Sequence, residues 1–166
     1  MGTTAITSGS LPTGTELLEL EAQVRSQGTG LAQAELVGCW RLQQVWGKGQ
    51  AQVNGLSSSL LRSLGACLIL TAGATDAELL ISNLVQLGAL QLRFDGEARL
   101  IGKRPLLQFS FARVEVRLNN WVLLQRSLAA MPAKRQPFFA LIGRDPAGWL
   151  AARGRGGGLA LWRSAP

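Results

Sequence analysis

Histidine and tyrosine are absent from this 166-residue sequence, and cysteine occurs only twice, as Cys39 and Cys67. The absence of histidine removes the side chain that most often serves as a general acid, general base or metal ligand. Both cysteines lie in apolar, strand-like segments without a histidine to activate a thiolate, so we interpret them as reduced and buried. We therefore expect a protein that is not an enzyme, with no catalytic residue, no metal and no cofactor.

Long apolar runs are also lacking. No stretch of eighteen or more apolar residues occurs, so we expect no transmembrane helix. Residues 1–9 have neither the basic start nor the apolar stretch of a secretory signal, which favours a protein that is cytoplasmic or peripheral to a membrane and not secreted. Because 47% of the residues are hydrophobic, one core is feasible, and we predict a loose segment at 1–12 and a single domain at 13–166.

Acidic residues are scarce in the second part of the chain. Residues 1–98 carry five Lys or Arg and eight Asp or Glu, a net charge of −3, whereas residues 99–166 carry twelve and two, a net charge of +10. Fourteen of the seventeen cations are Arg, which favours bidentate contacts with phosphate or carboxylate. Such a basic half suits an anionic membrane surface, a nucleic acid or an acidic protein, and is equally compatible with the solvated exterior of a sheet.

One helix is predicted near the N-terminus. Thr13 and Glu16 have the spacing of a capping box, in which both side chains satisfy free backbone N–H groups at a helix start. Leu17 and Val24 follow at helical spacing, and the glycines in 28–30 end the pattern. Because this helix has one apolar face, we expect it to lie on another part of the molecule.

Most of the remaining chain has the signals of short strands. We predict strands at 35–46 and 66–71, with a short helical turn near 57–64 between them. Residues 89–95 alternate cleanly between apolar and polar, and Asp95-Gly96 predicts a tight hairpin turn after them.

The apolar positions then change parity. Leu107, Phe109 and Phe111 share one face of an extended segment, but the apolar residues beyond Arg113 lie at the opposite parity. A strand cannot change faces in this way without a bulge or a break, so we place one near Ala112-Arg113. Such bends allow a sheet to curl into a barrel.

The chain ends with a strand, a glycine-rich turn containing Arg153, Gly154 and Gly157, and a second strand. This segment also resembles a phosphate-binding loop or an RNA-contacting Arg-Gly segment, but the apolar strands on both sides favour a hairpin. Gly38 and Trp40 open the first strand as Gly-x-Trp, and a chain that begins and ends in this way suits a barrel joining its ends. We therefore predict a mainly β, antiparallel, lipocalin-like barrel of about seven to nine strands, with an N-terminal helix and a short helical turn.

Four motifs occur in a defined order. They are the helix through Glu16-Leu17-Leu18, an L-x-G-x-W-x-L segment at 36–42, Asn83-Leu84-Val85 followed by an alternating hairpin, Arg104 and Phe109-x-Phe111, and a tail at 150–161 similar to L-R-x-x-R-G-x-x-G-x-x-x-V-L. Over residues 14–163 the chain thereby resembles the plastid-lipid-associated proteins, or fibrillins, which are similar to lipocalin-like calycin barrels. It departs from that family at Trp149, where the family often has Tyr-Leu-Asp, and at Arg155, which stands in place of an acid.

The resemblance implies a non-enzymatic protein of thylakoids or lipid bodies, which binds or organises hydrophobic molecules such as lipids, carotenoids or quinones. The lack of a transit peptide suits a photosynthetic cyanobacterium rather than a plastid-importing host. The basic C-terminal half fits docking on an anionic membrane.

We choose the candidate site residues only from their charge and from the strand face on which we expect them to lie. For a pocket that holds an apolar molecule we predict Trp40, Phe109, Phe111 and Trp121, which ordinary core packing explains equally well. For a membrane or anion surface we predict Arg113, Arg117, Arg126, Lys134 and Arg135.

Two alternatives stay open at this point. A lipocalin-like pigment chaperone or lyase would need a reactive or proton-handling group at the barrel mouth, which is hard to supply without histidine and tyrosine. A basic RNA-binding module is the less favoured alternative, because the sequence contains no recognisable RNA-binding motif.

Overall fold

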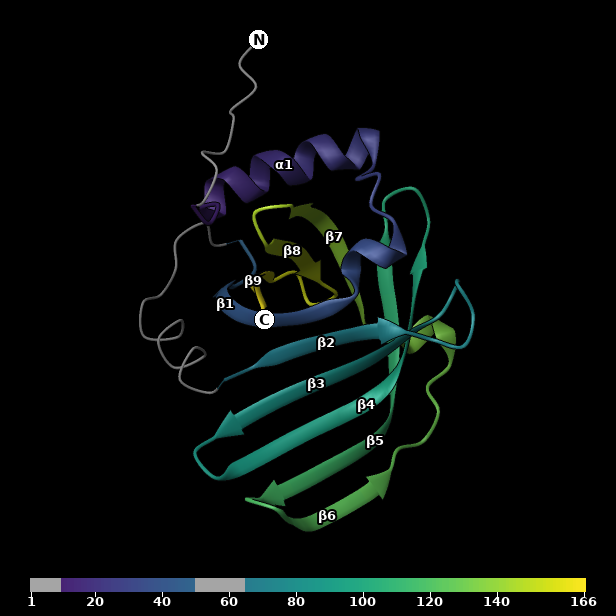
Figure 1. Ribbon diagram of the computed structural model, residues 1–166. Coiled ribbons are helices and arrows are strands. Elements are labelled where there is room, and N and C mark those ends of the chain that lie inside the picture. The colour runs from purple at the N-terminus through teal and green to yellow at the C-terminus, as the bar shows by residue number, and fades with distance from the viewer. Residues whose placement is uncertain (1–9, 50–64) are drawn as a thin grey trace.

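The computed structural model describes residues 10–49 and 65–166, which form one α-helix, two short 3-10 helices and nine strands (Figure 1). In chain order these are α1 (Gly14–Gln27), η1 (Gln33–Leu36), β1 (Gly38–Trp46), β2 (Cys67–Ala72), β3 (Leu79–Leu87), β4 (Leu90–Ile101), β5 (Leu106–Leu118), β6 (Trp121–Ser127), η2 (Ala133–Arg135), β7 (Phe138–Asp145), β8 (Trp149–Gly154) and β9 (Leu159–Ala165). The helical turn expected at 57–64 and most of the loose segment expected at 1–12 lie outside the described residues.

The sheet closes on itself. All strand pairs are antiparallel, and β1 to β5, β7, β8 and β9 pair in a ring in which β9 returns to β1. The closing register runs from Cys39 opposite Ala165 to Trp46 opposite Leu159, so the first and last strands join as expected from the two ends of the sequence. The fold is therefore mainly β, antiparallel and barrel-like, which confirms the predicted fold class.

Strand β6 stands outside the ring. One edge of β5 pairs with β7 over Leu106–Gln108 and with β6 over Arg113–Leu118, so the two neighbours divide that edge between them. In Figure 1, β6 lies at the end of the molecule far from α1, whereas β5 runs from beside the end of α1 down to β6. We call β6, with the β3–β4 turn and the strand ends beside it, the β6 side, and α1 with β7 to β9 and the start of β5 the helix side.

The predicted change of parity is a β-bulge. Asp95 of β4 pairs with Arg113 and Gly96 pairs with Phe111, which leaves Ala112 as the extra residue of β5. A Cβ on Gly96 would lie only 1.9 Å from the carbonyl oxygen of Ser110, so glycine is required where the two strands approach most closely.

The hairpin predicted at Asp95-Gly96 is wrong, because both residues lie inside the continuous strand β4. The chain turns instead before β4 at Gly88 and after it at Gly102, which have φ values of +56° and +83°. The dipeptide that is typical of a turn serves a close strand approach here.

Local signals at the other ends of elements have mixed outcomes. The first strand begins at Gly38 rather than at 35, because η1 occupies Gln33–Leu36. Asn119 and Asn120 form the turn between β5 and β6, with Asn119 at φ +51°. The connection between β6 and β7 contains η2.

Helix α1 has the predicted capping box, in which Thr13 N–H donates to Glu16 Oε2 at 2.7 Å and Glu16 N–H donates to Thr13 Oγ1 at 3.3 Å. The helix ends at Gly28, where a Cβ would lie 2.7 Å from the Lys103 carbonyl oxygen. Its Leu17 packs with Trp46, Trp149 and other side chains on the outside of the sheet. Among the described residues, no helix has the length and apolar character needed to span a membrane.

Candidate functional site

Three of the four aromatic residues predicted for the pocket lie together inside the ring of strands. Trp40 and Phe109 belong to the interior cluster of buried side chains, and Phe111 packs against it. Trp40 is 2% exposed, and its indole Nε1–H donates to the Leu36 carbonyl oxygen at 2.8 Å. Trp121 does not join them, because it begins β6 and is 78% exposed.

The interior aromatic residues form a chain of ring contacts. Phe94 and Phe111 have ring centroids 5.4 Å apart, Phe111 and Phe109 are also 5.4 Å apart, and Phe109 and Phe139 are 5.1 Å apart. Phe139 then contacts Trp162 edge-on at 5.3 Å. This chain leads from β9 across the interior to β4 on the β6 side, and it includes Phe94, Phe139 and Trp162, which the sequence-based choice of pocket residues omitted.

The apolar face continues beyond the interior. Leu90, Leu92 and Phe94 share a face of β4 with the buried Ala98, because side chains alternate along a strand. In register with them on β5 are Val114, Val116 and Leu118, and Leu118 in turn pairs with Trp121.

On the β6 side this surface has no covering layer among the described residues. All seven residues of β6 are exposed. We define the apolar rim as seven exposed large apolar side chains, at the β3–β4 turn, at the end of β5 and in the first four residues of β6, namely Leu87, Leu90, Leu118, Trp121, Val122, Leu123 and Leu124. Exposed apolar patches of this kind are typical of surfaces that contact another molecule or a membrane.

The five cations predicted for an anion surface differ in their pairing. Arg113 lies 3.0 Å from Asp95 Oδ2, and Arg117 forms an ion pair with Glu115. Arg126 follows the rim on β6, and Lys134 and Arg135 lie in η2; within the described parts of the chain these three have no acidic partner within ion-pair distance.

Asp95 is the centre of the polar network on the outside of this sheet. Burial by itself raises the pKa of its carboxyl group, but hydrogen bonds from Ser82, Arg93 and Arg113 outweigh that effect and hold the pKa below its usual value. The same contact with Asp95 raises the pKa of the Arg113 guanidinium. These charges are therefore partly neutralised within the protein.

On the helix side, a single buried carboxylate binds several arginines. Arg153 donates to Glu21 from Nε at 2.6 Å and from Nη2 at 2.5 Å, and Arg104 Nη2 donates to it at 3.1 Å. Arg25 lies 3.7 Å away on the next turn of α1. The hydrogen bonds from Arg153 are the main reason that the pKa of Glu21 is lowered, although burial opposes them. This cluster ties α1 to the sheet.

The tail residues form the expected hairpin turn. Gly154 N–H donates to the Gly158 carbonyl oxygen at 2.8 Å, and Gly157 has φ +92°. Arg153 Nη1 donates to the Gly157 carbonyl oxygen at 2.5 Å, so this arginine supports the turn and binds Glu21 at the same time.

Sequence reasoning missed Glu21. Its position four residues after Leu17 and three before Val24 places it on the apolar, buried face of α1, and that spacing was the available signal. An acid at a core-facing helix position requires a cationic partner, which only the folded chain identifies.

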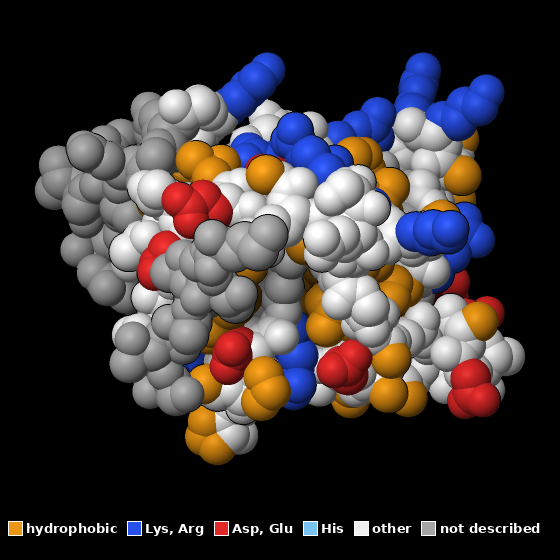
Figure 2. Space-filling view, turned by 90° about the horizontal axis from the view of Figure 1, so that it is seen from above, with side chains coloured by type: hydrophobic (Ala, Val, Ile, Leu, Met, Phe, Trp, Pro, Cys, Tyr) orange, Lys and Arg blue, Asp and Glu red, His pale blue; other side chains and the backbone are white. Residues whose placement is uncertain are grey.

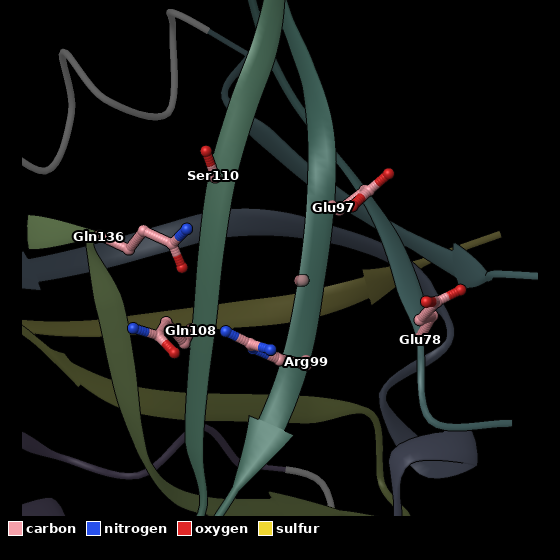
Figure 3. A pocket seen from close by; sticks show the side chains of 7 residues that line it. Glu78, Glu97, Arg99, Gln108, Ser110 and Gln136 are labelled. Carbon is pink, nitrogen blue, oxygen red and sulfur yellow. The ribbon is translucent and has the colours of Figure 1, made fainter. Parts of the chain in front are cut away.

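A polar groove of about 210 Å³ lies on the outside of β4 and β5 (Figure 3). It is lined by Glu78, Glu97, Arg99, Gln108, Ser110 and Gln136 and by Ala98. Among these described side chains, no hydrogen bond or ion pair joins Ser110 to a carboxylate.

The cysteines are free thiols on neighbouring strands. Burial raises the pKa of the Cys67 thiol to about 12, so it is protonated at neutral pH and is a poor nucleophile. In the described parts of the chain, no three Cys, Asp or Glu residues are grouped so as to hold a metal ion.

Comparisons with protein-family models, curated proteins and solved structures found no match.

Proposed function

We propose that this chain is a non-enzymatic, lipid- or isoprenoid-associated protein that holds small hydrophobic molecules along the apolar face of its barrel-like sheet. It docks on an anionic membrane through the apolar rim and the cations beside it. The continuity between the interior aromatic chain and the exposed rim is the observation that carries the proposal.

Physical chemistry supports docking at this surface. Water-exposed Leu and Trp side chains gain free energy when they enter an apolar phase, and tryptophan is enriched at the membrane–water boundary. Arg126, Lys134 and Arg135 lie on β6 and in η2 and, within the described chain, are not neutralised by an ion pair. Each cation near an anionic leaflet contributes about 1 kcal/mol to binding.

The same arrangement provides a route for an apolar ligand. Phe94 and Phe111 stand between the interior cluster and the rim, and both are half-buried. With the rim docked, a lipid, carotenoid or quinone passes from the bilayer to the aromatic chain without crossing water. The resemblance of the sequence motifs to fibrillins is the ground for assigning the membrane to thylakoids or lipid bodies.

Flotation on vesicles tests the docking surface. We expect the protein to float with phosphatidylglycerol-containing vesicles and less with phosphatidylcholine alone. Trp121→Ser combined with Leu123→Ser removes two exposed rim side chains and should abolish flotation. The matched control is Leu80→Ser, because Leu80 is 49% exposed but lies outside the rim. Flotation of the double variant at the wild-type level would refute the assignment.

Extraction of the purified protein with organic solvent, followed by mass spectrometry, tests the ligand. We expect a co-purified lipid or isoprenoid in the wild type and less of it in Phe111→Ala, which opens the aromatic chain without removing a fully buried residue. An empty wild-type extract, together with no uptake of added lipid, would contradict ligand binding.

A further inference from the structure

A second pocket lies on the helix side, outside the ring of strands. It has a volume of about 380 Å³ and forms where the start of β5, the start of β7 and the β8–β9 turn meet. Three arginines line it, Arg104, Arg153 and Arg155, together with Leu106, Phe138 and Ala140. Leu106 and the rim residue Leu118 are the two ends of β5, so this pocket is separate from the rim.

The pocket has an excess of positive charge. Arg25, Arg104 and Arg153 lie within 3.7 Å of the Glu21 carboxylate, which carries only one negative charge. Arg155 adds a further cation to the pocket wall. Arg25 and Lys48 line an adjoining groove on the other side of Arg153. Among the described residues that line the pocket and this groove, none is acidic. Figure 2, seen from the α1 side, shows most Lys and Arg side chains along the upper part of the view and most Asp and Glu side chains at its left and lower parts.

The arginines also differ in how far their donors are satisfied. Arg153 uses Nε and both terminal nitrogens on Glu21 and Gly157. Arg104 has one such bond, from Nη2 to Glu21, and its Nε is buried without a partner among the described residues. A guanidinium that has unused N–H donors and lies among excess positive charge favours binding of an anion. Its planar donor group matches the geometry of a carboxylate or phosphate.

Hydrogen bonds to the backbone hold Arg155 in position at the edge of the pocket. Its two terminal nitrogens donate to the backbone oxygens of Gln136 and Lys134, at 3.0 and 3.3 Å, and its own N–H donates to the Phe138 oxygen at 3.2 Å. A pre-positioned guanidinium loses little conformational freedom on binding a ligand. This residue replaces an acid in the motif that the chain otherwise resembles, so the sequence departs from the motif at the pocket wall.

The opposite wall is apolar. Leu106 and Phe138 are half-buried and Ala140 is buried, and they lie on the outer face of β5 and β7. We propose that this pocket binds an anionic amphiphile, with a phosphate or carboxylate group at Arg104 and Arg155 and an apolar chain on Leu106, Phe138 and Ala140. The site does not depend on ligand binding inside the barrel.

Isothermal titration with octyl phosphate below its micelle concentration tests the site. The comparison ligands are inorganic phosphate, which lacks the chain, and octyl glucoside, which lacks the charge. We expect octyl phosphate to bind at least roughly tenfold more tightly than either, because both halves of the pocket contribute. Raising the salt concentration should weaken its binding.

Substitutions assign the binding to this pocket. Arg155→Gln and Arg104→Gln should each weaken octyl phosphate binding about tenfold, the usual effect of losing a hydrogen bond to a charged group. Arg163→Gln is the matched control, because it removes the same charge from an exposed residue that does not line the pocket. Arg155 makes no contact with Glu21, so its variant keeps α1 anchored if Arg104→Gln is destabilised.

Three results would overturn the proposal. They are equal binding of octyl glucoside, equal binding of inorganic phosphate, or octyl phosphate binding that Arg155→Gln and Arg163→Gln leave equally unchanged. Flotation on vesicles containing phosphatidic acid distinguishes the source of the anion: loss of flotation in Arg155→Gln points to a lipid headgroup, and unchanged flotation with weakened octyl phosphate binding points to a soluble amphiphile. Because Trp121→Ser with Leu123→Ser leaves this pocket intact, failure of rim docking is distinguishable from failure of this site.

Discussion

The helix side and the β6 side of the same sheet are covered differently. On the helix side, α1 packs a second apolar cluster against β7, β8 and β9, and a buried Glu21 binds Arg153 and Arg104 across the two layers. On the β6 side, the apolar face that begins in the interior extends into a strand with every residue exposed. One side therefore stabilises the fold, and the other presents an exposed apolar surface of the kind that is typical of interaction sites.

The largest expected difference between the two sides concerns tryptophan. Trp40→Ala removes a fully buried side chain and should lower the free energy of unfolding by about 3–5 kcal/mol, whereas Trp121→Ala should change it by less than about 0.5 kcal/mol. Urea denaturation of both variants measures this. Truncating a buried aromatic side chain costs roughly 3–5 kcal/mol. If Trp121→Ala loses about 2 kcal/mol or more, the rim is covered in the folded protein.

The next expected effect concerns the buried carboxylate. Glu21→Gln leaves Arg153 and Arg104 without their counter-charge and should cost about 3 kcal/mol of unfolding free energy. Glu97→Gln, at an exposed acid of β4 with no ion pair in the described chain, should have almost no effect. Chemical denaturation with both variants in parallel is the test, and equal stabilities would show that α1 does not need this cluster.

A smaller effect is expected at the bulge that separates the interior from the β6 side. Gly96→Ala introduces a methyl group against the Ser110 backbone and should destabilise the fold by about 1–3 kcal/mol. The exposed Gly88→Ala is not a clean control, since Gly88 has φ +56°; Gly156→Ala is suitable, because it has no neighbour within 4 Å and no positive φ. If Gly96→Ala and Gly156→Ala have the same melting temperature, the close approach of β4 and β5 is wrong.

The pH dependence of stability should be the smallest contrast. The folded-state pKa of Glu21 is lowered, chiefly by Arg153, so its contribution is complete above the unfolded value near 4.5 and is lost as the pH falls through the folded value. The unfolding free energy should therefore fall as the pH drops below about 4.5, and Glu21→Gln should flatten that fall more than Asp95→Asn. Denaturation curves between neutral and acid pH measure the slopes, and a greater flattening in Asp95→Asn would reverse the comparison.

The sequence predicts the local features of this fold better than its layers. The capping box at Thr13, the parity change near Ala112 and the Gly-x-Trp strand all depend on residues close together in the chain, and the structure confirms each. The prediction of a turn at Asp95-Gly96 was wrong, because the sequence does not distinguish a glycine needed for close contact between strands from a glycine needed for a turn.

The candidate sites depend on contacts between distant parts of the chain. Trp121 has the same alternating surroundings as the interior aromatics, and only the division of the β5 edge between β6 and β7 shows that it lies outside the ring. Glu21 and Arg153 are 132 residues apart, so neither the ion pair nor the arginine pocket beside it was visible in the sequence.

Tryptophan fluorescence tests most directly whether the apolar rim contacts a membrane. Trp121 is 78% exposed, whereas the other four tryptophans are at most 5% exposed, so the difference between the wild type and Trp121→Phe isolates its emission. With phosphatidylglycerol-containing vesicles, we expect this difference spectrum to shift to shorter wavelength and to be quenched by brominated lipid. A difference spectrum that stays at the wavelength of a water-exposed indole and is not quenched would contradict docking through the rim.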